Sequence, residues 1–270
     1  MSRLDDCFEA LTEAGQKALV PFVAAGDPNA EFTLACMHGM VNAGANIIEL
    51  GVPFSDPMAD GPVIQKASER ALANGMSLIG VIDIVRQFRL QNQTTPVVLM
   101  GYLNPIEFMG YDAFAQKAAE AGVDAVLTVD IPPEESAELL KAYEKHGLAP
   151  IFLLSPTSHE SRIKKVAAVG KGYIYYVSIK GVTGTGDLEL SEVADKLAEI
   201  KRHTSLPLAV GFGVKNADIA ANIAKISDAV VVGSALINCI TDHADDETKG
   251  QQAIETLLSD MRIAMDAVTK

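Results

Sequence analysis

Short apolar runs recur along the chain at fairly even spacing, and their length and β-branched content are those of strands buried on both faces. Gly or Pro residues lie near these runs and predict turns beside them. The eight predicted strands are Ala18–Ala24, Asn46–Leu50, Val97–Met100, Ala125–Thr128, Ala149–Leu154, Tyr173–Val177, Pro207–Val210 and Ala229–Val232.

Amphipathic stretches separate the runs and predict helices. Two capping signals support this interpretation: Asp27-Pro28 is expected to start the first of these helices, and Ser191 followed by Glu192 a later one. The predicted helices are Phe32–Ala43, Leu78–Leu90, Tyr111–Ala121, Glu134–His146, Glu160–Val169, Ser191–Lys201, Asn216–Lys225 and Thr248–Val268.

Alternation of eight strands with helices predicts a (β/α)8 TIM barrel, as one domain spanning residues 1–270. The main rival is a doubly wound open sheet, which shares the βαβ unit. A dinucleotide-binding sheet would carry G-x-G-x-x-G after its first strand, whereas Ala25-Gly26-Asp27-Pro28 stands there and favours the barrel. The segment Leu4–Ala14 predicts an extra helix that covers the bottom of the barrel.

The formal net charge of −13 argues against nucleic acid and membrane surfaces as partners. The net charge does not exclude an anionic substrate, because backbone amides at a helix N-terminus can hold a phosphate locally. Cys7, Cys36 and Cys239 are too few and too dispersed for a disulfide framework or a zinc cluster. With no signal peptide and no apolar run of membrane-spanning length, we expect a cytoplasmic protein.

A carboxyl interrupts the second predicted strand near its end. Glu49 would be costly to bury there without a partner or a purpose, and in barrels of this type the chemistry lies at the C-terminal ends of the strands. The long loop that follows, residues 51–62, adds Asp56 and Asp60. The alternatives are a structural carboxylate for Glu49 and a turn with helix cap for Asp60-Gly61-Pro62.

Glycine motifs after the seventh and eighth strands predict a phosphate site. The segments 211–214 and 233–235 open onto helical stretches, where backbone amides can face a dianion, although each motif alone also suits an ordinary turn. Residues 178–187 have the Gly and Thr content of a mobile lid.

The fourteen residues from Ile48 to Gly61 resemble the signature of tryptophan synthase α subunits, with Glu49 and Asp60 in register. The resemblance continues in order through residues 22–28, 101–105, 129–135, 181–184 and 211–213, and so covers essentially the whole chain. It implies a TIM-barrel lyase that splits indole-3-glycerol phosphate into indole and glyceraldehyde 3-phosphate.

By this resemblance Glu49 is the proton shuttle and Asp60 anchors the indole. Apolar barrel walls would raise the pKa of Glu49 so that it exchanges protons near neutrality, while Asp60 would stay ionised and accept the indole N–H. The remaining implied residues are Tyr173, Tyr175 and Thr183 in support, Gly184, Gly211, Gly213, Gly233 and Ser234 at the phosphate, and Phe22, Ile64, Met100, Leu127 and Phe212 around the indole. For the two tyrosines and the apolar residues, plain core packing is the alternative.

No metal or cofactor is expected in this chain. The predicted strands lack the Lys of a Schiff-base aldolase, and the five His residues lack ligand spacing. The resemblance implies a pyridoxal-phosphate β subunit as partner, in an α2β2 heterotetramer, with contacts at Pro53, Asp56, Asn104 and Pro132. A stand-alone lyase that releases free indole, another phosphate-binding barrel such as an isomerase, and a protein that mainly activates a partner are the alternatives.

Overall fold

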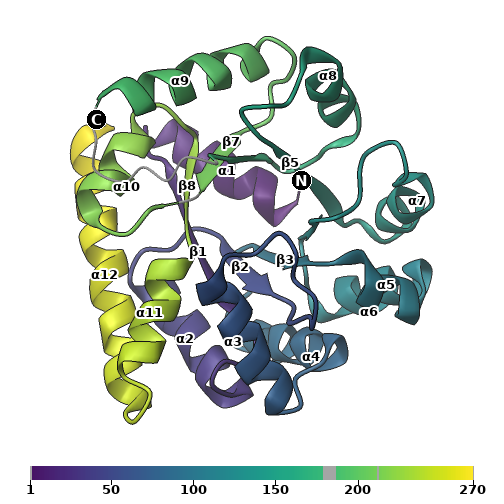
Figure 1. Ribbon diagram of the computed structural model, residues 1–270, viewed down its shortest axis with the longest axis vertical. Helices are drawn as coiled ribbons and strands as arrows, with labels where there is room; N and C mark the ends of the chain where they lie inside the picture. The colour runs from purple at the N-terminus through teal and green to yellow at the C-terminus, as the bar shows by residue number, and fades with distance from the viewer. Residues whose placement is uncertain (1, 179–186, 212, 270) are drawn as a thin grey trace.

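Eight parallel strands close into a barrel in chain order, with β8 paired to β1 (Figure 1). The computed structural model describes residues 2–178, 187–211 and 213–269. The strands are β1 (Ala18–Ala24), β2 (Ile48–Gly51), β3 (Val97–Gly101), β4 (Ala125–Thr128), β5 (Ala149–Leu154), β6 (Ile174–Val177), β7 (Leu208–Gly211) and β8 (Ala229–Val232). Each predicted strand is confirmed to within two residues at its ends.

Helices surround the barrel and confirm the (β/α)8 fold (Figure 1). They are α1 (Arg3–Glu13), α2 (Ala30–Asn42), α3 (Pro62–Ala73), α4 (Leu78–Arg89), α5 (Leu103–Met109), α6 (Tyr111–Ala121), α7 (Ala137–His146), α8 (Glu160–Val169), α9 (Asp187–Lys201), α10 (Ala217–Ala224), α11 (Ser234–Asp242) and α12 (Glu247–Val268). Within the described ranges, none of these helices is long and apolar enough to span a bilayer.

Alternate residues of each strand face opposite sides of the barrel wall. In the second strand Ile48 and Leu50 belong to the apolar layer between strands and helices, whereas Ile47 belongs to the cluster that fills the barrel interior. The alternation therefore directs Glu49, which stands between Ile48 and Leu50, into the interior.

Helix α1 covers the bottom of the barrel, as predicted. Ser2 caps it in a capping box with Asp5, and its buried face contributes Leu4, Phe8 and Leu11 to the interior cluster. The guanidinium of Arg3 pairs with Asp124 at 2.9 Å and ties the helix to the start of β4. The bottom of the barrel is thus sealed, which leaves substrate access at the opposite end.

Both predicted caps were wrong. Asn29, not Asp27-Pro28, caps α2 by accepting from the amide of Phe32, because the Asp27 carboxylate is engaged by Arg70. Helix α9 begins at Asp187, so Ser191 lies inside it. Helix α7 begins at Ala137 rather than Glu134, since a turn closed by the Glu135 amide on the Pro132 carbonyl precedes it. The short helix α5 was not predicted.

Candidate active site

Glu49 lies at the mouth-facing end of the barrel interior and is fully buried. In the parallel register it stands beside Phe22 of β1 and Val98 of β3. The hydroxyl of Tyr173 donates to its Oε1 at 3.3 Å, and Oε2 has no hydrogen-bond partner among the residues described. A buried carboxyl oxygen without a partner is costly, which favours a proton on this group or a ligand beside it.

Burial is the main influence on this carboxyl. It raises the pKa of Glu49 to about 8; the hydrogen bond from Tyr173 opposes the rise, and the negative charge of Asp60 adds to it. Near neutral pH the side chain therefore exists in both its protonated and ionised forms. A group in that state can both give and take a proton during one reaction cycle.

Asp60 is held from two sides at the start of α3. The hydroxyl of Tyr102 donates to Asp60 Oδ2 at 2.9 Å, and the side-chain amide of Gln65 donates to the Asp60 backbone carbonyl at 2.8 Å. Burial raises the pKa of the Asp60 carboxyl, and the Tyr102 hydrogen bond opposes the rise. The carboxylate is thus fixed in direction while its charge is still supported by a donor.

Tyr102 is a site residue that the sequence did not single out. Its hydroxyl accepts from the Ala59 amide at 3.0 Å while donating to Asp60, and its ring stacks on Phe54 with centroids 5.3 Å apart. The available signal was its place directly after β3, at the end of the barrel where function lies. Through these contacts one residue organises the loop that follows β2.

A small cavity lies between Asp60 and the strand ends, lined mostly by apolar side chains. Three of the predicted indole residues, Phe22, Ile64 and Met100, line it together with Asp60. Leu127 does not line it and is fully buried in the interior cluster with Tyr173, although its register partner Met100 lines the cavity. Phe212 lies outside the described residues. The remaining lining residues are Ala24, Gly51, Val52, Ser68, Gly101, Tyr102 and Val129.

Two glycines at strand ends make room for aromatic rings of the site. A Cβ at Gly51 would stand 2.6 Å from Cζ of Phe22, and a Cβ at Gly211 would stand 2.1 Å from the Tyr175 hydroxyl oxygen. Both distances are well below van der Waals contact. The rings of Phe22 and Tyr175 therefore depend on these glycines for their positions.

Tyr173 and Tyr175 face the same interior, as the alternation predicted. Burial raises the pKa of both phenols well above the ordinary value, and the charge of Glu49 adds to each rise. The charge of Asp60 also reaches Tyr175. Both tyrosines thus remain neutral hydrogen-bond donors, and Tyr175 lies within the field of both carboxylates.

The glycines predicted to hold phosphate gather at the ends of two paired strands. Gly211 ends β7 and is in register with Val231 of β8, which is followed by Gly233 and Ser234 at the start of α11. Gly213 has a φ of 79°, a conformation that favours glycine. No side chain of the described residues caps α11, and the amide of Leu236 donates to the Gly233 carbonyl. Thr183 and Gly184, with most of the predicted lid, lie outside the described residues.

The residues predicted to meet a partner differ in exposure. Asp56 and Asn104 are exposed, Pro132 is half-buried and Pro53 is buried. Exposed apolar side chains stand close to them in sequence, since Met58 is 79% and Phe108 94% exposed. Among the described residues no cluster of His, Cys, Asp or Glu could hold a metal ion.

The chain is similar to proteins of one family over nearly its full length. A family model described as tryptophan synthase alpha chain matches residues 8–266. Curated alpha chains from Thioalkalivibrio sulfidiphilus and Methylococcus capsulatus are 60% and 57% identical, over 98% and 99% of this chain and all of each relative. The crystal structure of tryptophan synthase subunit alpha from Legionella pneumophila is 46% identical, with a TM-score of 0.93 and 99% of each chain covered.

Proposed function

The chain belongs to the tryptophan synthase alpha chain family, and from this premise we propose that Glu49 and Asp60 carry out its chemistry. Its reaction is the lyase step of tryptophan biosynthesis, in which indole-3-glycerol phosphate is cleaved to indole and glyceraldehyde 3-phosphate. The roles of Glu49 and Asp60 are those that the family resemblance implies, and the geometry of the site supports them.

Cleavage breaks the bond between C3 of the indole and C3′ of the glycerol chain. A proton added to C3 places positive charge on the ring nitrogen. Loss of the 3′-hydroxyl proton then forms the aldehyde carbonyl, the bonding electron pair returns to the ring, and the nitrogen becomes neutral. The reaction needs one group that first gives and then takes a proton, and one that stabilises the transient cation.

Glu49 is the group that exchanges protons. The observation that carries this assignment is a fully buried carboxyl with an unpartnered Oε2 and a pKa raised by burial to about 8. Its protonated form gives the proton to C3, and the resulting carboxylate takes the proton of the 3′-hydroxyl. The residue ends the cycle as it began, so no proton need come from water.

Asp60 stabilises the cation on the ring nitrogen. Among the described contacts only its Oδ2 is engaged, by Tyr102, so Oδ1 is available to accept the indole N–H. The apolar walls made by Phe22, Ile64 and Met100 suit the flat ring. Exclusion of water from this cavity strengthens the interaction between the carboxylate and the developing charge.

The phosphate lies, in this proposal, at the ends of β7 and β8. Gly211, Gly213, Gly233 and Ser234 offer backbone amides, and the start of α11 adds the favourable field of a helix N-terminus. Tyr173 and Tyr175 support the reacting centre as neutral donors near Glu49. Thr183 and Gly184 are proposed to complete the site from the segment that follows β6.

The proposal is tested by steady-state turnover of purified protein with indole-3-glycerol phosphate, in the presence of a chelator. We expect both products from the wild-type protein and a loss of at least about 100-fold in kcat for E49Q, the size typical of a lost acid–base group. Near-normal turnover by a folded E49Q would contradict the assignment. E144Q, an exchange on the outer helix α7, is the matched control.

We also propose that the chain works in the cytoplasm, as one domain and without a cofactor of its own, and passes indole to a pyridoxal-phosphate β subunit in an α2β2 assembly. The exposed Asp56 and Asn104, with Pro53 and Pro132, form the proposed contact surface. Gel filtration with and without a β subunit tests this. Separate elution at micromolar concentration would favour a stand-alone lyase.

A further inference from the structure

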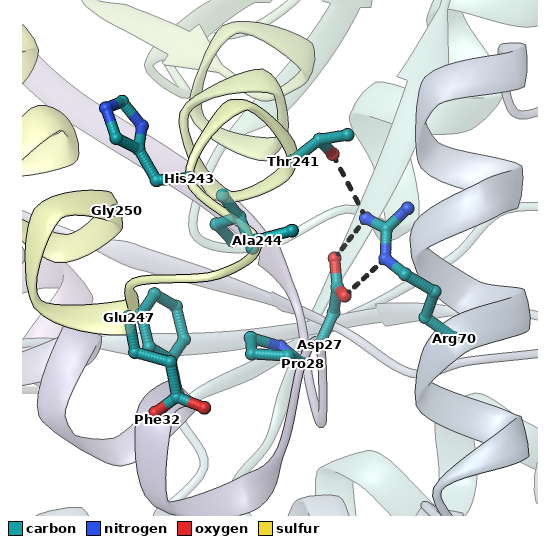
Figure 2. A pocket seen from close by; sticks show the side chains of 10 residues that line it. Asp27, Pro28, Phe32, Arg70, Thr241, His243, Ala244, Glu247 and Gly250 are labelled. Atoms are coloured by element: carbon teal, nitrogen blue, oxygen red, sulfur yellow. Dashed lines mark hydrogen bonds and ion pairs between the residues drawn. The ribbon is translucent and has the colours of Figure 1, made fainter.

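A bidentate ion pair joins the turn after β1 to the last turn of α3. The Nε and Nη2 atoms of Arg70 lie 2.8 and 2.7 Å from the two carboxylate oxygens of Asp27 (Figure 2). The Asp27 side chain is completely buried, whereas that of Arg70 is 37% exposed. Paired donors on a buried carboxylate fix direction as well as distance, so this contact sets the orientation of the two segments it joins.

The same guanidinium reaches a third element. Its Nη2 lies 3.4 Å from Oγ1 of Thr241, which belongs to α11 (Figure 2). Arg70 thus contacts the β1 turn and α11 while being carried by α3. Helix α11 packs against both α3 and β1, so the guanidinium stands where the three elements meet.

These elements carry opposite ends of the proposed substrate site. Helix α3 begins at Pro62, directly after the loop that bears Asp60, and its Gln65 holds the Asp60 carbonyl. Helix α11 begins at Ser234, where the phosphate is proposed to bind. The placement of α3 against α11 therefore determines the separation between the indole anchor and the phosphate site.

Apolar packing also joins these elements, because Val63, Ile64 and Ala67 of α3 cluster with Phe22 and Ala24 of β1 and Ile237 of α11. The buried side chains of α3 are only Ala67, Ser68 and Ala71. A cleft adjoins the ion pair, lined by Asp27 and Arg70 and by residues of α2, α11 and α12 (Figure 2). The bidentate pair adds a directional contact in the last turn of α3, at the opposite end of the helix from Val63 and Ile64.

We propose that Arg70 is a positioning residue, which matches the Asp60 end of the site to the phosphate end by fixing α3 against α11 and the β1 turn. The inference rests on the roles proposed above for Asp60 and for the start of α11. It predicts that replacement of Arg70 lowers kcat/KM for indole-3-glycerol phosphate, while each half of the substrate still binds.

The test compares the whole substrate with its two halves. Indole and glycerol 3-phosphate are titrated separately by calorimetry into wild-type protein and R70K, and the same proteins are assayed with indole-3-glycerol phosphate. Lysine keeps the charge beside Asp27 but cannot make the bidentate contact. We expect affinities for each half within about twofold of wild type and a fall in kcat/KM of about 10- to 100-fold, as small misplacements of reacting groups cause.

A second variant keeps the proposal testable if R70K does not fold. D27N/R70M removes both charges and so leaves no buried carboxylate without a partner. It is expected to repeat the R70K pattern more strongly. R86K, a change in the exposed Arg86–Asp83 pair of α4, is the matched control and should leave every value unchanged.

The possible outcomes are distinct. Equal losses in the affinity for each half and in kcat/KM for the whole substrate would show that the replacement loosens the whole site, and would overturn the proposal. Unchanged kcat/KM in both folded variants would also overturn it. A wild-type protein that binds both halves but does not cleave the linked substrate would instead overturn the proposed function. That result is visible before any variant is made.

Discussion

The hydroxyl of Tyr102 stands between the Asp60 carboxylate, to which it donates at 2.9 Å, and the Ala59 amide, from which it accepts at 3.0 Å. One phenol therefore joins the side chain of Asp60 to the backbone just before it. Its ring is buried and stacked on Phe54, which fixes the position of the hydroxyl. Loop, aromatic pair and carboxylate act as one unit.

Replacement of Tyr102 by Phe tests that unit. The ring packing on Phe54 is kept, while Asp60 loses a donor that lowers its pKa and fixes its direction. A hydrogen bond to a charged group contributes about 1.5–3 kcal/mol, so we expect kcat/KM for indole-3-glycerol phosphate to fall about 10- to 100-fold. Y111F on the outer helix α6 is the control. An unchanged kcat/KM in Y102F would contradict the role given to this hydrogen bond.

Glu49 predicts an unusual dependence of stability on pH. Its pKa is about 8 in the folded protein and about 4.5 when unfolded, so between these values the folded state holds a proton that the unfolded state has released. The extra proton held by Glu49 stabilises the folded state. This contribution to the free energy of unfolding is fully present below pH 4.5 and is lost as pH rises toward 8, at up to about 1.4 kcal/mol per pH unit.

E49Q removes this loss because its amide does not titrate. We expect E49Q to be as stable as the wild type near pH 4.5 and increasingly more stable toward pH 8, measured by urea unfolding at a series of pH values. E144Q, at an exposed position on α7, is measured alongside as the control. A constant difference between E49Q and wild type across the range would mean that the pKa of Glu49 is not raised.

The strand positions and Glu49 could be predicted from the sequence because both depend on local periodicity. Buried parallel strands need continuous apolar runs, so their positions were readable, and Glu49 stood out because a carboxyl interrupts one of them. The glycines at strand ends could be recognised in the sequence, but the aromatic rings that pack against them could not. That Gly211 admits the Tyr175 hydroxyl depends on the pairing of β6 with β7.

Contacts between segments distant in the chain could not be predicted from the sequence. Asp27 has the local form of a helix cap, yet its carboxylate is bound by Arg70, a partner 43 positions away. Tyr102 stood in a motif after β3, but nothing local pointed to Asp60 as its partner. Leu127 is in register with Met100 of β3, yet only Met100 lines the cavity, and nothing in the local sequence distinguishes the two.

Gly211 gives a prediction about packing. An added Cβ would meet the Tyr175 hydroxyl oxygen at 2.1 Å, so G211A must displace that ring from its place near Glu49. Overpacking of this kind costs about 1–3 kcal/mol, and we expect a lower urea midpoint together with a reduced kcat. G250A in α12 is the control, because its Cβ would meet only an ordinary contact at 3.7 Å. Equal behaviour of the two variants would rule out the displacement.

The exposed Phe108 gives a prediction about the partner. It is 94% exposed on α5, the helix that also carries Asn104, and a large apolar side chain in that state is available for burial by another protein. F108D should leave the unfolding free energy of the isolated chain within about 0.5 kcal/mol of wild type. It should weaken binding to a β subunit at least about 10-fold, measured by calorimetry, since a buried aromatic anchor at an interface contributes more than 1 kcal/mol. L90D, at a 75% exposed apolar position just after α4, is the control and should bind normally. If F108D and L90D bind β alike, the surface around α5 is not the contact, and the interface has to be sought elsewhere on the barrel.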